Sequence, residues 1–249
     1  MKRILAAILL GLFVFASGSV GFDIVKAGAP SAVGVASTES ITDANDYLER
    51  FLEDNGDRTS FTEGEVKARA RLKELFTDIG FTDTDASAAE PGGTLAYGKL
   101  ADTEPTFTVE EQPFTVTTAA TFSAAAKEYG SANVVARLPG KADGGVVIIG
   151  AHYDNTYGDI TGVANTGTKG VGAYDNGTGI AVMLSLAEYF YELYQTTPLD
   201  FSIEFVAYGA SMAGGIGSQQ YVTKRLSMPS DRKAVLLAVN LDCVGAGDY

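Results

Sequence analysis

Three short stretches of this chain carry side chains of the types that hold metal ions. Residues 150–154 (GAHYD) contain the only histidine, His152, followed by Asp154. Residues 172–179 (GAYDNGTG) contain Asp175, and Asp242 lies near the end of the sequence. Zinc accepts imidazole and carboxylate ligands, and a carboxylate can bridge two ions. These residue types therefore indicate a metal site or a site of proton transfer.

Apolar runs place two of these stretches at the ends of strands. Residues 146–149 (VVII) are typical of a strand buried on both faces, and His152 follows them. Residues 235–240 (VLLAVN) form a second continuous run, which predicts a central strand ending just before Asp242. In open α/β sheets, ligands bind beyond the carboxyl ends of parallel strands, where loops carry the chemistry on a rigid base.

Periodicity predicts the remaining elements. Helices are expected at 46–53, 62–79, about 178–194 and about 218–226, and further strands at 114–117, 133–138 and 201–207. We expect strands 133–138 and 146–149 to form a hairpin-like pair, and Thr62 and Glu65 to form a capping box. Strands that alternate with helices favour a three-layer α/β/α fold with a mostly parallel, mixed central sheet.

The N-terminus predicts export. A basic start, an apolar run from Ile4 to Ala16 and small residues after it are typical of a secretory signal peptide, with cleavage after Ala16, Gly18 or Ala27. An uncleaved anchor is the alternative, although the run is short for a membrane span. The predicted organisation is a signal peptide (1–27), a flexible leader (28–41) and a single domain (42–249). We expect the mature protein to be secreted and extracellular.

The net charge and the cysteine content limit which binding partners and which disulfide bonds are expected. The formal net charge is −13. A surface this acidic repels nucleic acid and anionic lipid, so we expect no nucleic acid and no stable membrane partner after signal cleavage. Cys243 is the only cysteine, which excludes an intrachain disulfide. In a strand its side chain would point away from that of Asp242, and we interpret it as a structural cysteine.

Taken together, these motifs resemble the secreted co-catalytic zinc aminopeptidases, a family that includes bacterial leucyl aminopeptidase, aminopeptidase Y and relatives of glutamate carboxypeptidase. The resemblance runs from about Asp46 to Val244. Residues 58–81 are similar to the first helical region of the family, and residues 133–140 (NVVARLPG) to the strand and turn before its metal loop. The resemblance implies the zinc exopeptidase fold, two zinc ions and a peptide or peptide-like substrate.

The resemblance also implies a role for each candidate residue. His152 corresponds to a terminal zinc ligand, Asp154 to the carboxylate that orients the site, Asp175 to the carboxylate that bridges both ions, and Asp242 to the carboxylate that completes the shell of the first ion. It further implies a cis peptide between Asp175 and Asn176. The glycosylation sequon that begins at Asn176 lies inside this motif, and we interpret it as a chance match.

Two positions depart from the family pattern. Where the family carries Gly-Ala-Glu-Glu-x-Gly-Leu-x-Gly-Ser, residues 209–218 read GASMAGGIGS. Ser211 therefore stands at the general-base position, where it is not expected to replace the base, and Met212 stands at the position of a ligand to the second ion. The second histidine ligand of the family lies downstream of the position of Asp242, and this chain has one histidine.

We therefore expect one zinc ion at most and weak or absent aminopeptidase activity, because loss of a general base costs about 10²–10⁴-fold in rate. One alternative is a non-catalytic pseudoenzyme that binds peptides or another protein through the same cleft. A second alternative is that the sequence is a fragment of a longer reading frame. In that case the sheet is expected to be incomplete at its C-terminal edge.

Overall fold

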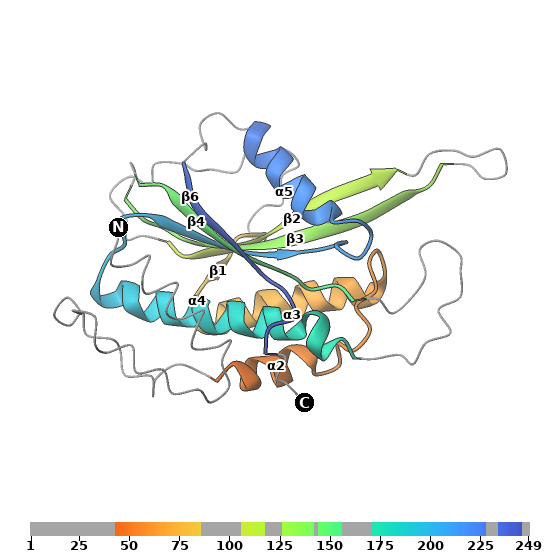
Figure 1. Cartoon of the computed structure of the whole chain (residues 1–249), viewed down its shortest axis with the longest axis horizontal. Coiled ribbons are helices and arrows are strands. Elements are labelled where there is room, and N and C mark those ends of the chain that lie inside the picture. Colours follow the sequence, from red (N-terminus) through yellow and green to blue (C-terminus); the bar gives the residue numbers. More distant parts are fainter. Residues whose placement is uncertain are drawn as a thin grey trace.

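Six strands form one mixed sheet in the computed structural model, which describes residues 43–85, 106–117, 126–141, 144–155, 171–227 and 234–245. The strands are β1 (Thr82–Asp83), β2 (Thr108–Thr117), β3 (Glu128–Leu138), β4 (Val146–His152), β5 (Ser202–Tyr208) and β6 (Val235–Leu241). Their order across the sheet is β1-β2-β3-β5-β4-β6 (Figure 1).

Helices cover both faces of this sheet. Three helices lie on one face: α2 (Ala44–Leu52), α3 (Glu63–Ile79) and α4 (Thr178–Thr196) (Figure 1). Helix α5 (Ile216–Ser227) lies on the other face. The predicted three-layer α/β/α architecture is confirmed.

The parallel part of the sheet lies where the candidate site was expected. Strand β4 pairs in parallel with β5 on one side and with β6 on the other. Strand β3 runs antiparallel to both β2 and β5. The predicted hairpin of β3 and β4 is therefore wrong: β5 lies between them, because the chain leaves β4, crosses over through α4 and returns in parallel, as βαβ units do.

Strand β6 lies at an edge of the sheet among the described strands, so the prediction of a central strand is wrong. Its only described neighbour is β4, and Val235 and Leu236 are 50% and 40% exposed. Further along β6, Leu237 and Val239 pack against the main core. A continuous apolar run reports side-chain types rather than neighbours, and so it does not separate an edge strand from a central one.

The main hydrophobic core fills the space between the sheet and helices α2, α3 and α4. Phe76 of α3 and Phe205 of β5 are fully buried, and both rings contact that of Phe81. Helix α4 buries most of its length, including Ile180 and Leu184, in the same core. Each such side chain contributes about 1.5–3 kcal/mol on burial, so the strand ends that carry the site rest on a firmly packed base.

The start of α3 differs from the predicted capping box. The Thr62 hydroxyl donates to the carbonyl of Thr59 (2.6 Å) and accepts no hydrogen bond from an N–H of the first turn of the helix. The fully buried carboxylate of Glu65 instead accepts from Phe61 N (2.7 Å) and Ala210 N (2.9 Å), and also from the hydroxyl of a serine on β3. Burial raises the pKa of Glu65. Glu65 therefore ties α3 to the loop after β5, and tertiary contacts override the local motif.

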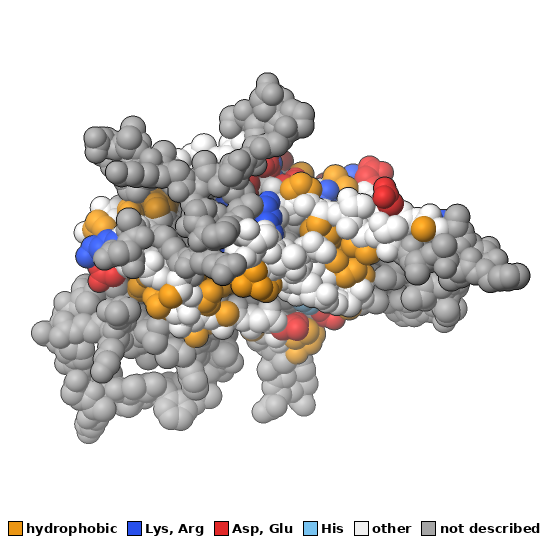
Figure 2. Space-filling view, turned by 90° about the horizontal axis from the view of Figure 1, so that it is seen from above, with side chains coloured by type: hydrophobic (Ala, Val, Ile, Leu, Met, Phe, Trp, Pro, Cys, Tyr) orange, Lys and Arg blue, Asp and Glu red, His pale blue; other side chains and the backbone are white. Residues whose placement is uncertain are grey.

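Seen from the α5 side, hydrophobic side chains form separate small patches among polar and charged ones (Figure 2). None of the helices in the described ranges has the length and apolar character needed to cross a membrane. The predicted signal peptide and leader lie outside the described residues.

Candidate metal site

Three predicted ligands meet at the carboxyl ends of β4 and β6. The Nε2 atom of His152 lies 3.2 Å from Asp175 Oδ1 and 3.6 Å from Asp242 Oδ1. One ligand atom from each residue lies within 4.8 Å of the other two. The His152 side chain is 11% exposed, whereas those of Asp175 and Asp242 are 49% and 53% exposed. The imidazole is thus seated in the protein while the carboxylates face solvent.

The ring of His152 is oriented by the main chain of Asp154. Its Nδ1 lies 3.0 Å from the Asp154 carbonyl oxygen. Because a carbonyl can only accept, Nδ1 is the donor in this contact, and Nε2 is the nitrogen that faces Asp175 and Asp242 and could bind a metal ion. Burial lowers the pKa of His152, but hydrogen bonding to Asp154 and the charges of Asp154 and Asp175 outweigh it, so the pKa is raised overall.

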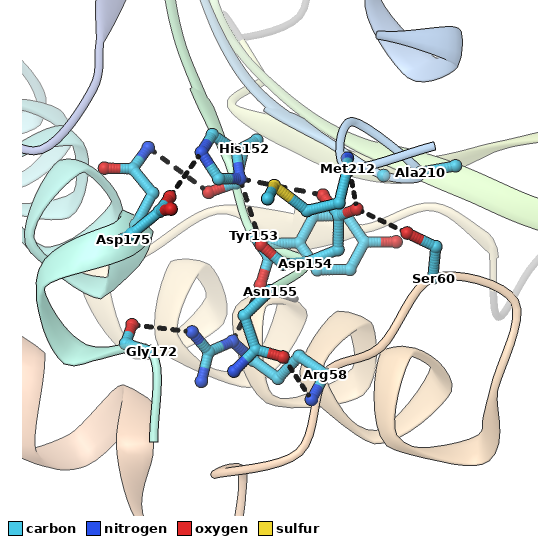
Figure 3. Close-up of polar contacts among 12 residues, drawn as sticks. Arg58, Ser60, His152, Tyr153, Asp154, Asn155, Gly172, Asp175, Ala210 and Met212 are labelled. Atoms are coloured by element: carbon cyan, nitrogen blue, oxygen red, sulfur yellow. Dashed lines mark hydrogen bonds and ion pairs between the residues drawn. The ribbon is translucent and has the colours of Figure 1, made fainter. Parts of the chain in front are cut away.

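The carboxylate of Asp154 connects the site to two other segments. Its Oδ2 accepts from the Ser60 hydroxyl (2.6 Å) and from the backbone N–H of Met212 (2.9 Å) (Figure 3). Its Oδ1 is buried 3.7 Å from His152 Nδ1 and has no hydrogen bond within the described part of the chain. Asp154 therefore contacts the imidazole mainly through its carbonyl, while its side chain fixes the surrounding loops.

Arg58 holds the loops that carry His152 and Asp175. It is fully buried and donates to four carbonyl oxygens, at 2.7–2.8 Å. These oxygens belong to Tyr153, Asn55, Val171 and Gly172. Burial lowers the pKa of Arg58 to about 10, although nearby carboxylates raise it. The guanidinium is therefore charged at neutral pH and joins the end of β4 to the segment before α4 (Figure 3).

The segment that presents Asp175 is an irregular turn. Gly172 begins it with φ +61, and a Cβ there would lie 2.7 Å from the Nη2 atom of Arg58. The turn, Ala173–Gly177, closes with a hydrogen bond from Gly177 N to Gly172 O (3.0 Å). The Asp175–Asn176 peptide is cis, as the resemblance implied. Asn176 is fully buried, so the folded chain does not offer the sequon to a glycosylating enzyme.

The loop after β5 brings no carboxylate to the site. The Ser211 carbonyl accepts from Gly214 N (3.0 Å) and Gly215 N (2.8 Å), which closes a tight turn. The side chain of Met212 is 38% exposed, and its backbone N–H reaches Asp154. The structure therefore places Ser211 and Met212 beside the metal loop, with a hydroxyl and a thioether where the related pattern has two carboxylates.

Cys243 lies nearer the site than the sequence predicted. It follows the end of β6 and has φ +49, so the alternation of side chains along a strand no longer applies. Burial, a hydrogen bond to Asp242 and the charges of Asp175 and Asp242 raise the pKa of its thiol to about 11. The prediction that this side chain points away from Asp242 is wrong. Its sulfur is not among the three ligand atoms that converge.

The donor set fits a zinc ion. One imidazole nitrogen and two carboxylates are the ligands zinc accepts, and three protein ligands leave a coordination position open. The sequence motif identified these three residues but gave no sign of Arg58, Ser60 or the Asn176 side chain. Each of these lies in a polar loop, where composition alone does not reveal burial.

Comparison of the sequence with known proteins identifies relatives of this chain. The model of Peptidase family M28 matches residues 133–249. Aminopeptidase YwaD of Bacillus subtilis (strain 168) is 34% identical over 100 residues, which are 40% of this chain and 18% of that protein. The match thus spans only a small part of the relative's length.

Solved structures share the fold over most of this chain. An aminopeptidase from Aneurinibacillus sp. strain AM-1 superposes with a TM-score of 0.57 at 15% identity, covering 84% of this chain and 72% of that one. BSAP, a zinc aminopeptidase from Bacillus subtilis, gives 0.55 at 15%, covering 81% and 69%. A glutaminyl cyclase from an Acidobacteriales bacterium gives 0.54 at 18%, covering 92% and 64%. At these identities the likeness establishes the fold and leaves the reaction open.

Proposed function

We propose that this chain is a zinc-binding protein of the aminopeptidase type that holds a single zinc ion, because residues 133–249 match the model of Peptidase family M28. In this proposal His152, Asp175 and Asp242 hold the ion, and aminopeptidase activity is weak or absent. The observation that carries the proposal is the convergence of these three ligand atoms beside a loop, residues 209–218, without a carboxylate.

The residues around the ion have distinct tasks. The Asp154 carbonyl keeps the proton on Nδ1 of His152, so that Nε2 is free to bind. Asp175 and Asp242 supply the negative charge that balances a divalent cation. When bound, zinc would polarise a substrate carbonyl and lower the pKa of a water molecule.

Proton transfer is the step that the chain's own residues do not support. The Ser211 hydroxyl is too weak a base at neutral pH without an activating partner, and the chain contains no second histidine to activate it. Met212 offers a thioether, which takes up no proton. The expected deficit in rate from a missing general base is about 10²–10⁴-fold.

A non-catalytic role is the second candidate, and the same loop favours it. Binding a peptide through its terminal groups needs the fold and the partly exposed site, but it does not need a general base. In this second candidate the protein binds a peptide without cleaving it. Either role concerns peptides or peptide-like molecules.

The test is turnover of a chromogenic aminoacyl substrate by the full chain loaded with zinc, beside a M28 aminopeptidase under the same conditions. We expect a rate lower by about 10²-fold or more. A rate within tenfold of the active relative would contradict the proposal. Binding of the same peptides without hydrolysis, measured by calorimetry, would favour the non-catalytic candidate over an impaired enzyme.

We also propose that the protein acts outside the cell, on the basis of the N-terminal pattern of residues 1–27. N-terminal sequencing of the protein recovered from culture medium tests this. We expect a start after Ala16, Gly18 or Ala27, and a protein that stays in the cells with Met1 intact would contradict it.

A further inference from the structure

The side chain of Asn176 uses its whole hydrogen-bonding capacity within the protein. Its Nδ2 donates to Leu241 O (2.8 Å) and, at a longer 3.4 Å, to His152 O. Its Oδ1 accepts from Gly179 N (3.1 Å) and Cys243 N (3.0 Å). A carboxamide offers two donors and two acceptor sites, and this fully buried one has a partner for each.

These partners are backbone groups of the three segments that carry the metal ligands: the end of β4, the end of β6, and the turn that runs into α4. One is the carbonyl of His152 itself. Two others, Leu241 O and Cys243 N, belong to the residues on either side of Asp242. The fourth, Gly179 N, lies in the first turn of α4, three residues after Asn176. Asn176 itself directly follows Asp175 in the chain. A single side chain thus fixes the ends of β4 and β6 relative to the turn before α4.

We propose that Asn176 is the positioning residue of the metal site, which holds the three ligands in binding geometry through their main chains. The proposal rests on the proposed zinc site. Asn176 offers no atom to the ion, because its carboxamide is turned to the backbone and is fully buried. Partners that orient metal ligands in this way typically contribute about 10–100-fold to metal affinity.

The chain makes room for this side chain at Gly179. A Cβ at that position would lie 2.4 Å from Asn176 Oδ1 and 2.6 Å from both Asn176 Nδ2 and Leu241 O. Since these distances are far below contact, any side chain at residue 179 would push the carboxamide away from its partners. Gly179 thus offers a second way to disturb the same contacts without changing Asn176.

Asn133 provides a matched control. It is also fully buried, and its Nδ2 donates to Gln112 Oε1 (3.0 Å) and Gly217 O (2.9 Å) while its Oδ1 accepts from Gly209 N (3.2 Å). It therefore has a carboxamide of the same type with nearly the same number of bonds. Its partners lie on β2, at the start of the loop after β5 and in the first turn of α5, and none belongs to a ligand segment.

The experiment measures zinc affinity of the full chain by competition with a chromophoric chelator, for the wild type, Asn176→Ala and Asn133→Ala. Circular dichroism and thermal unfolding of the metal-free proteins show that each is folded at the temperature used. We expect both variants to lower the melting temperature, because both leave buried backbone groups unpaired. We expect zinc affinity to fall by about 10–100-fold in Asn176→Ala and to stay within about threefold in Asn133→Ala.

The outcomes separate a positioning role from a merely structural one. Zinc affinity of Asn176→Ala within threefold of the wild type, or an equal loss in Asn133→Ala, would overturn the proposal. If Asn176→Ala does not fold, Gly179→Ala decides: about tenfold weaker zinc binding supports the proposal, and wild-type affinity overturns it. Absence of zinc binding by the wild type would overturn the proposed function itself, whereas wild-type binding with unchanged variants would overturn this inference alone.

Discussion

The two loop regions at this edge of the sheet differ in what their side chains do. The metal-ligand region, meaning residues 150–155, 171–179 and 241–243, is fixed by buried polar groups and presents an imidazole and two carboxylates. The loop after β5, residues 209–215, is also anchored at its start, since Gly209 N donates to Asn133 and Ala210 N donates to Glu65. The tip of this loop, however, forms a tight turn closed by hydrogen bonds to the Ser211 carbonyl, and it carries no carboxylate side chain.

This difference shows that the position of a loop's backbone does not determine which functional groups its side chains supply. The Met212 N–H still donates to Asp154, so the loop lies against the metal-ligand region. What it lacks is a carboxylate at Ser211 and at Met212. The backbone of the loop is thus in place beside the metal-ligand region, but its side chains offer no carboxylate.

The largest expected effect is loss of zinc from the metal-ligand region. His152→Ala and Asp242→Asn should lower zinc content of the purified protein from about one ion per chain to well below that level, because three protein ligands are the usual minimum for an open zinc site. Asp200→Asn is the matched control, since Asp200 is similarly exposed and pairs with Lys141. Elemental analysis after dialysis measures the zinc content per chain. A full zinc content in His152→Ala would show that the metal-ligand region does not hold the ion.

The next effect concerns the stability of the metal-ligand region. Arg58→Ala leaves four carbonyl oxygens without their donor and should lower the free energy of unfolding by on the order of 3 kcal/mol. Arg71→Ala is the control: Arg71 is 24% exposed, pairs with Glu53 and Glu74 at the surface and donates to one carbonyl oxygen, that of Arg50, rather than to four. The expected loss is about 1 kcal/mol. Urea unfolding of the metal-free proteins tests this, and equal losses would show that Arg58 is not a special support.

A pair of serines compares the two regions directly. Ser60→Ala removes a donor to the buried Asp154 carboxylate and should cost about 1–3 kcal/mol of unfolding free energy. Ser211→Ala removes a hydroxyl from a partly exposed turn that is closed by backbone bonds, and should change stability by less than about 0.5 kcal/mol. The same urea experiment measures both. A Ser211→Ala loss as large as that of Ser60→Ala would mean that the loop after β5 has its own structural network.

The smallest expected effect comes from restoring the missing acids. We expect the double variant Ser211→Glu, Met212→Glu to leave turnover of an aminoacyl substrate within about tenfold of the wild type, since a second ion would still lack an imidazole ligand in this chain. A matched Ser211→Gln, Met212→Gln variant controls for size. A rise of a hundredfold in the Glu variant alone would show that the two carboxylates were the only deficit.

The sequence predicted those parts of the molecule that depend on local pattern. The strand at 146–149, the helix after Asp175 and the meeting of His152, Asp175 and Asp242 are found as expected. Pairing was harder to predict: the apolar run of β6 gave no sign that it lies at an edge, and β5 separates β3 from β4. Neighbours in a sheet are decided by long-range packing, which short runs do not encode.

Polar tertiary contacts were the other part that the sequence did not reveal. The Thr62 and Glu65 spacing predicted a local cap, but Glu65 bonds instead to Phe61 and to two residues distant in the sequence. The side chain of Cys243 does not follow the alternation of side-chain directions along a strand, because β6 ends at Leu241. For Glu65, contacts with distant segments outweighed a local capping preference of about 1 kcal/mol.

The most direct test of the one-ion site is calorimetric titration of the metal-free full chain with zinc. The account predicts a single binding event of one ion per chain, lost in His152→Ala. Two ions bound with comparable affinity, or no zinc binding at all, would contradict it.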